Sequence, residues 1–322
     1  MIIKRKSMNN SWENLVDGLK NRDVRAMARL ITFVENRESG WEDAMKAVYP
    51  DTGSARVFGI TGSPGVGKST LTSEISQEFV NRGLTVGIIA VDPSSPFSGG
   101  ALLGDRLRMK KIFTMKEVFI RSMATRGTLG GLNQAARDVV RILDAYGKDI
   151  ILIETVGVGQ DEIEVVKAAD LVMVICVPGQ GDGIQAIKAG IMEIADFFIV
   201  NKADMQGADV VMADISGMLE LSAEKDQSLP PVLKTSAMKS EGIKELVSML
   251  LHHKTDEKKY ARRRELGVKE EIFNLAKEEI FQKVRKKWEQ DGVLDEIVKQ
   301  VMEKKKDPYT IVKELLEQNK CL

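Results

Sequence analysis

The chain has 322 residues, in which 47 lysines and arginines balance 47 aspartates and glutamates. This length allows one large domain with flanking elements, or two domains. The balanced charge argues against a nucleic acid or a membrane surface as partner. Two cysteines, Cys176 and Cys321, are too few for a disulfide framework, and no long apolar run is present. We therefore expect a cytoplasmic protein.

The first fifty residues are predicted to be helical. Trp12, Leu15 and Leu19 recur at helical spacing, and a second apolar series follows the capping site at Asp23. The pattern ends at Pro50–Gly53, where proline and glycine break it. We expect a helical hairpin, in a segment spanning 1–54, that packs on the next part of the chain.

The strongest motif lies at 56–70, RVFGITGSPGVGKST. A short apolar run ends in a glycine-rich turn that leads into a helix, which is the context of a phosphate-binding P-loop. Lys68 is placed to reach the β- and γ-phosphates, and the Ser69 hydroxyl is a natural Mg²⁺ ligand. The residues predicted to bind the nucleotide here are Gly62, Ser63, Pro64, Gly65, Val66, Gly67, Lys68, Ser69 and Thr70.

Apolar strands then alternate with amphipathic helices to about residue 254. The expected strands are Val57–Ile60, Thr85–Val91, Val118–Met123, Ile150–Ile153, Leu171–Val177, Phe197–Val200 and Val232–Lys234. Nearly continuous apolar strands are typical of a sheet covered on both faces. We predict an α/β P-loop NTPase domain over 55–254, with a mainly parallel sheet flanked by helices.

A second motif, Asn201-Lys202-Ala203-Asp204, follows the strand FFIV. The Asp204 carboxylate can accept two hydrogen bonds from guanine, whereas adenine would leave it unpaired at a cost of about 1–3 kcal/mol. Asn201 would brace the loop, the Lys202 stem would lie on the ring, and the backbone of Ser236 and Ala237 would reach the guanine oxygen. The motif favours GTP over ATP.

Three acids are candidates for the surroundings of Mg²⁺, together with Ser69. Asp92 and Glu154 end strands, and Asp105 lies in the sequence GDRLRM. Each can also be a helix cap or a solvated charge, but an acid that ends a buried strand, as Glu154 does, is costly unless it is used. Gly157 is placed to donate its backbone N–H to the γ-phosphate.

The segment 178–188, PGQGDGIQAIK, has more glycine than a plain loop needs. Gln185 and Lys188 are one helical turn apart, so they can face the same direction. They are candidate catalytic residues of a switch that responds to a partner. The alternative is a solvated connector.

From about residue 255 the chain is charged, with little glycine and no strand pattern. An apolar stripe of Ile272, Ala276, Ile280, Val284 and Trp288 recurs every four residues, and shorter helices follow Asp291-Gly292 and Asp307-Pro308. A narrow stripe on a charged helix needs a partner surface. We expect a dimerisation arm over 255–322, the alternative being packing on the same chain's nucleotide-binding domain.

Six segments taken together, among them GITGSPGVGKST, VDPSSPFSGGALLGDRLRM, ETVGVGQDEIEV, PGQGDGIQAIKAGIMEIAD and NKAD, resemble the MeaB/ArgK-type GTPases. The resemblance covers nearly the whole chain. It implies a homodimeric GTP/GDP- and Mg²⁺-dependent chaperone of an adenosylcobalamin-dependent acyl-CoA mutase, such as methylmalonyl-CoA mutase, with a cobalamin adenosyltransferase as a further candidate partner. It also implies that the loops 92–108, 154–160 and 179–188 are the three switches.

The resemblance predicts gating of cofactor loading and protection of the mutase through GTP hydrolysis. Ser63-Pro64 follow the first glycine where related GTPases often carry a lysine, so hydrolysis is expected to be slow alone and faster with a partner. Three alternatives remain at the sequence level: a GTPase that inserts nickel, a GTP-binding adaptor without turnover, and a small-molecule kinase. The first would require clusters of histidine or cysteine, which the sequence lacks. Its two histidines form the pair His252-His253 after a helix, and we expect both to be surface residues.

Overall fold

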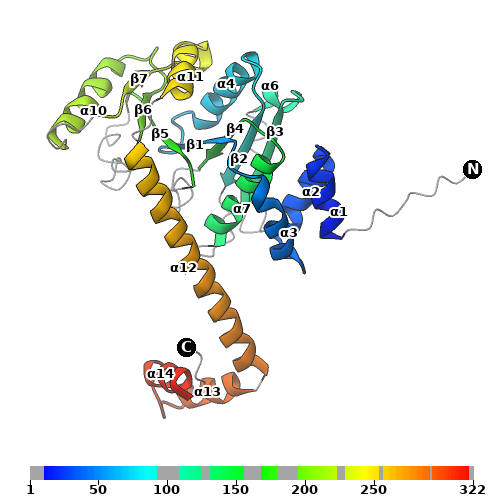
Figure 1. Cartoon of the computed structure of the whole chain (residues 1–322). Coiled ribbons are helices and arrows are strands. Elements are labelled where there is room, and N and C mark those ends of the chain that lie inside the picture. The colour runs from blue at the N-terminus through cyan, green and yellow to red at the C-terminus, as the bar shows by residue number, and fades with distance from the viewer. Residues whose placement is uncertain are drawn as a thin grey trace, which may run out of the picture. The chain divides into compact units, whose positions relative to one another are not determined.

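The computed structural model describes residues 11–92, 109–124, 131–155, 168–179, 195–222, 229–253, 257–290 and 292–318. The chain divides into two compact units, Met1–Thr255 and Asp256–Leu322. The first unit holds a sheet with its helices (Figure 1). Within its described residues, the second unit consists of helices joined by short turns.

The strands are β1 (Arg56–Thr61), β2 (Val86–Asp92), β3 (Val118–Ala124), β4 (Ile150–Glu154), β5 (Leu171–Cys176), β6 (Phe197–Val200) and β7 (Val232–Lys234). The helices of the first unit are α1 (Trp12–Lys20), α2 (Val24–Glu35), α3 (Trp41–Val48), α4 (Lys68–Asn81), α6 (Lys110–Phe113), α7 (Gly131–Ala145), α10 (Ala208–Ser222) and α11 (Ile243–His252), with short 3₁₀ turns η1 (Tyr49–Asp51) and η2 (Ala237–Lys239).

The seven strands form one sheet in the order β3-β2-β4-β1-β5-β6-β7, and every adjacent pair is parallel. β1 therefore lies at the centre, between β4 and β5. This confirms both the α/β fold and the seven strands predicted from the sequence, with small differences at their ends. Because parallel strands end at the same edge, the loops after β1, β4 and β6 can meet there.

Both faces of the sheet are buried at its centre, which explains why β5 and β6 are apolar without interruption. Alternate residues point to opposite faces: Ile151 and Ile153 of β4 belong to one core cluster, whereas Ile150 and Leu152 belong to the other. One face packs against α7, α10 and the N-terminal helices, and the other against α4, α6 and α11 (Figure 1).

The described part of the N-terminal segment, from residue 11, has three helices where the sequence pattern predicted a hairpin of two. The break lies at Arg37, which has a positive φ of 52° after the end of α2. Its guanidinium lies 3.7 Å from the centroid of the Trp41 ring at the start of α3, and it pairs with Asp138 of α7 at 3.0 Å. A left-handed residue stabilised by these two contacts separates α3 from α2.

The connection between these helices and β1 is held by one buried carboxylate. Asp144 of α7 accepts hydrogen bonds from the backbone N–H groups of Gly53, Ser54 and Ala55, at 2.5, 3.1 and 2.8 Å. A carboxylate has enough lone pairs for three donors. The contact fixes the point at which the chain enters β1 and hence the P-loop.

We expect Asp144→Asn to lower the free energy of unfolding by about 3 kcal/mol, because the amide nitrogen offers N–H groups where the backbone also donates. Urea unfolding followed by tryptophan fluorescence, to which Trp12 and Trp41 of this segment contribute, measures this change. The exposed Asp43, which pairs with Lys46 at 2.9 Å, supplies the control Asp43→Asn. Equal midpoints for the two variants would contradict the anchoring role.

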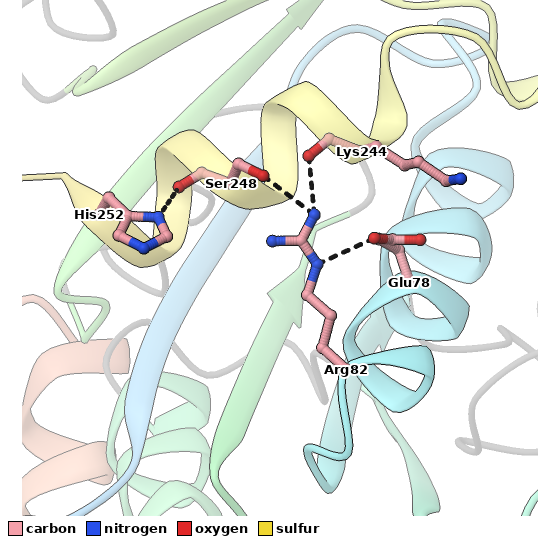
Figure 2. A network of polar contacts seen from close by, with 5 residues as sticks. All are labelled: Glu78, Arg82, Lys244, Ser248 and His252. Atoms are coloured by element: carbon pink, nitrogen blue, oxygen red, sulfur yellow. Dashed lines mark hydrogen bonds and ion pairs between the residues drawn. The ribbon is translucent and has the colours of Figure 1, made fainter.

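Helices α4 and α11 are joined at the surface by Arg82, at the C-terminal cap of α4 (Figure 2). Its guanidinium pairs with Glu78 at 2.9 Å and donates to the Lys244 carbonyl at 2.9 Å and to the Ser248 hydroxyl at 3.0 Å. The Ser248 carbonyl lies 2.8 Å from Nδ1 of His252. Together with the apolar core between them, these contacts join α11 to the helix that follows the P-loop.

The two histidines were predicted to be surface residues. His252 is exposed, but the ring of His253 is partly buried and lies 4.8 Å from the Phe197 ring, centroid to centroid. The expectation is therefore wrong for His253, because the end of α11 returns over β6. In the described part of the chain, no group of three or more His, Cys, Asp or Glu residues could hold a metal ion.

The second unit consists of α12 (Glu257–Gln290), α13 (Val293–Met302) and α14 (Pro308–Gln318). The breaks at Asp291-Gly292 and Asp307-Pro308 are where the sequence predicted them. Ile272 and Ile280 of the predicted stripe are exposed, whereas Val284 is buried. Phe273 and Phe281 are exposed beside them. Among the described helices of the whole chain, none is both long and apolar enough to span a bilayer.

Candidate functional site

The P-loop joins the central strand β1 to α4, as the sequence predicted. Gly62 has a φ of 146°, and a Cβ there would lie 2.4 Å from the Ile175 carbonyl oxygen of the neighbouring strand. Gly67 has a φ of 92°, and a Cβ there would lie 2.7 Å from Nδ2 of Asn201. Only glycine fits these two positions, because the loop is wedged between β5 and the NKAD segment.

Lys68 begins α4 and is almost fully buried. Its ammonium donates to the carbonyl oxygens of Gly62, at 2.6 Å, and Ser63, at 3.1 Å. The charge therefore lies inside the curve of the loop. A phosphate entering the loop would meet this ammonium together with the N-terminus of α4, where backbone N–H groups favour anions.

Ser69 and Glu154 are brought together by the pairing of β1 with β4. Ile60 is opposite Glu154 in the sheet, and the Ser69 hydroxyl donates to Oε1 of Glu154 at 2.5 Å. Both side chains are buried. Hydroxyl and carboxylate oxygens are the ligand types that Mg²⁺ prefers, so this pair fits the ion.

Asn201 braces the P-loop from the adjacent strand end. Its amide nitrogen donates to the Val66 carbonyl at 2.9 Å, and its amide oxygen accepts from the Ala237 N–H at 3.1 Å and the Thr235 hydroxyl at 3.3 Å. Lys202 has a positive φ of 55° and donates to the Gly65 carbonyl at 2.9 Å. One short segment after β6 therefore connects the P-loop to the loop after β7.

Asp204 is held by that same loop after β7. The Ser236 hydroxyl donates to its Oδ1 at 2.7 Å, and the Lys239 ammonium lies 3.5 Å from its Oδ2. The pKa of Asp204 is held below its usual value, mainly by the hydrogen bond from the Ser236 hydroxyl. A backbone hydrogen bond and the nearby Lys239 ammonium lower it as well. The side chain is partly exposed and ionised at neutral pH, so it can accept two N–H groups of a guanine base.

The predicted backbone contacts to the guanine oxygen remain predictions. Here the Ser236 N–H donates to the Glu241 carbonyl at 3.1 Å and the Ala237 N–H donates to Asn201. A base would have to share the Ala237 donor. Thr235 and Lys239 were missed by sequence reasoning; the only signal for them was their position on either side of Ser236-Ala237.

Other predicted site residues are located only in part. Ser63 and Pro64 lie in the P-loop, and Thr70 lies in the first turn of α4. Asp92 ends β2, but its side chain is not described. Four further candidates lie outside the described residues: Asp105, Gly157, Gln185 and Lys188.

These features define a P-loop nucleotide-binding protein: a central parallel strand, a glycine loop around a buried lysine, and a serine–carboxylate pair at the end of the next strand. A family profile described as "Methylmalonyl Co-A mutase-associated GTPase MeaB" matches residues 27–289. The chain belongs to this MeaB family of GTPases, which also includes ArgK-type proteins. The family binds guanine nucleotides.

Individual relatives agree with this assignment. The chain is 46% identical to the protein PH0274 of Pyrococcus horikoshii over 95% of this chain and 97% of that one. It is 32% identical to the mitochondrial methylmalonic aciduria type A homolog of Caenorhabditis elegans, over 84% and 73% of the two chains. A crystal structure of an LAO/AO transport system kinase superposes with a TM-score of 0.66 at 26% identity, covering 96% of this chain and 97% of that one.

Proposed function

We propose that the protein hydrolyses GTP to GDP and phosphate as a chaperone of an adenosylcobalamin-dependent acyl-CoA mutase, methylmalonyl-CoA mutase being the first candidate. In this role it gates cofactor loading and protects the mutase. The observation that carries the proposal is that the chain belongs to a family of mutase-associated GTPases. Its NKAD segment, which would read the base, is hydrogen-bonded to its P-loop. A cobalamin adenosyltransferase is a second candidate partner.

The proposed division of labour within the site follows from the contacts. Lys68 would neutralise the β- and γ-phosphates, and Asp204 would select guanine over adenine. Ser69 and Glu154 would hold Mg²⁺, Ser69 directly and Glu154 through water, with Asp92 and Asp105 as additional acids. The ion would neutralise charge that develops on the phosphates. The positions of Gly157, Gln185 and Lys188 in the sequence assign them to loops that respond to the γ-phosphate and to the partner.

Hydrolysis is proposed to be slow in the isolated protein, because the P-loop offers Ser63-Pro64 where related GTPases place an activating lysine. We expect purified methylmalonyl-CoA mutase to accelerate it at least about tenfold, a coupling within the usual range between two sites. GTP turnover is measured with the mutase and with an equal amount of a cobalamin-independent enzyme as control. Equal rates in both mixtures, without co-elution of chaperone and mutase, would reject the proposed role.

We propose three functional parts: the helical segment 1–54, the GTPase domain 55–254 and a dimerisation arm 255–322. The arm is supported by the exposed Ile272, Phe273, Ile280 and Phe281 of α12. Burying one such side chain contributes about 1.5–3 kcal/mol, so several of them on one helix favour a second copy as partner. We also assign the protein to the cytoplasm, in keeping with its two cysteines.

The arm is tested by sedimentation of the full chain beside a double variant, Ile272→Glu with Ile280→Glu. We expect a dimer for the parent and a monomer for the variant, because two charges would be buried without partners in the interface. The exposed Val210 of α10 supplies the control Val210→Glu, which should remain dimeric. Monomers at micromolar concentration for all three chains would contradict the arm.

A further inference from the structure

Helix α4 carries a buried carboxylate that the nucleotide site described above does not use. Glu74 is only 7% exposed, six residues after Lys68 on the same helix. Its two oxygens bind two different elements. Oε1 pairs with the Lys111 ammonium of α6 at 2.8 Å, and Oε2 accepts from the Ser240 hydroxyl at 2.5 Å.

These two partners belong to segments next to the strands at opposite edges of the sheet, and both segments lie on the face that α4 covers. Helix α6 precedes β3, the strand at one edge, and Ser240 follows β7, the strand at the other edge. Helix α4 crosses the face between them, because it starts at the end of the central β1. One carboxylate thereby joins both flanks to the helix that begins at the P-loop.

The charged form of Glu74 is the stable one. Burial raises the pKa of its carboxyl, but the hydrogen bonds from Lys111 and Ser240 together lower the pKa by more than burial raises it. The net shift is therefore downward. At neutral pH Glu74 is therefore a fixed anion with two donors. Replacing it with a smaller residue would release both elements, whereas an amide of the same shape could still accept from Ser240.

Ser240 closes the turn that holds Asp204. It caps η2 with a positive φ of 55°, and the turn is completed by paired backbone hydrogen bonds between Ser236 and Glu241 at 3.1 Å. Within this turn the Ser236 hydroxyl donates to Asp204, and Lys239 lies beside the same carboxylate. The bond from Ser240 to Glu74 is thus the link between the base-binding turn and α4.

We propose that Glu74 is a positioning residue for base recognition: through Ser240 it holds the turn 236–241 so that Asp204 meets the edge of the guanine. The proposal rests on the proposed guanine-binding role of Asp204. A residue that merely stabilises α4 would affect all ligands of the site equally. A residue that positions the turn affects only the part of the affinity that depends on the base.

The test separates base from phosphate with three ligands and the full chain. IDP lacks only the exocyclic amine that GDP offers to Asp204, and pyrophosphate has no base. We expect the parent to bind GDP about tenfold or more tightly than IDP, and Glu74→Ala to lose most of that ratio while its affinity for pyrophosphate stays unchanged. Calorimetry gives all three dissociation constants.

Three further variants sharpen the result. Glu74→Gln should restore the GDP-to-IDP ratio, since its amide oxygen can accept from Ser240. Ser240→Gly removes the hydroxyl at a position whose φ suits glycine, and should reproduce the loss even if Glu74→Ala fails to fold. The matched control is Glu78→Ala: Glu78 is one turn along the same helix and pairs with Arg82, which contacts Lys244 and Ser248 of α11 (Figure 2).

An unchanged GDP-to-IDP ratio in Ser240→Gly and in any folded Glu74→Ala would overturn the proposal. A parallel fall in the affinity for GDP, IDP and pyrophosphate would overturn it as well, because it would show a general effect on the site. If the parent itself does not distinguish GDP from IDP, the proposal that Asp204 recognises the guanine base is rejected. The proposed role of Glu74, which depends on it, is then rejected as well.

Discussion

Lys68→Ala is expected to abolish GTP turnover and to weaken nucleotide binding by about 2–3 kcal/mol, which corresponds to about 30- to 150-fold in Kd. The reason is geometric. The Lys68 ammonium is buried within the curve of the P-loop, where it donates to the carbonyls of Gly62 and Ser63. Apart from this ammonium, the loop offers a phosphate mainly backbone dipoles, so its removal leaves most of the phosphate charge uncompensated.

The chain supplies a matched control in a second buried lysine. Lys148 is equally buried, donates to the Glu117 carbonyl at 2.8 Å, and belongs to no part of the proposed site. Lys148→Ala should cost stability but keep the parent's turnover once folded. Turnover is measured by phosphate release at saturating GTP, with circular dichroism to establish that both variants are folded. Undiminished turnover in Lys68→Ala would remove the catalytic role given to the P-loop.

Asp204→Asn is expected to change the preferred base from guanine to xanthine. The carboxylate can accept the ring N–H and the exocyclic amine of guanine, whereas an amide can donate to the carbonyl that xanthine has in place of that amine. The Ser236 hydroxyl can still donate to the side-chain oxygen, so the turn is retained. We expect the affinity for GDP to fall about 10- to 100-fold and the affinity for XDP to rise by a comparable factor.

Dissociation constants for GDP, XDP and ADP measure this change. The control is Asp209→Asn, at an exposed aspartate nearby in the chain that pairs with Lys234 at 2.6 Å. It should keep the parent's preference for GDP. A variant at position 204 that still prefers GDP over both other nucleotides would show that Asp204 does not face the base.

Local sequence patterns predicted the strands and most of the helices, and two parts of the candidate site, the P-loop and the NKAD segment. Each strand is a short apolar run, and the P-loop and NKAD segments each combine a strand end with a specific turn chemistry. These signals lie within windows of about ten residues, where periodicity and turn preference act. The three N-terminal helices show the limit: the apolar spacing predicted helix throughout, but the break at Arg37 depends on its contacts with Trp41 and with Asp138 of α7.

The sequence by itself determined the parallel α/β domain and the glycine-rich loop that joins β1 to α4, and it predicted that Asp204 reads the base, because each follows from residues adjacent in the chain. Only the tertiary structure decided which side chains meet. Ser69 reaches Glu154, Lys202 reaches Gly65, and Glu74 reaches Ser240 across separations of 85, 137 and 166 residues. These pairings depend on the order of the strands and on the face that each helix covers, and no local pattern encodes either.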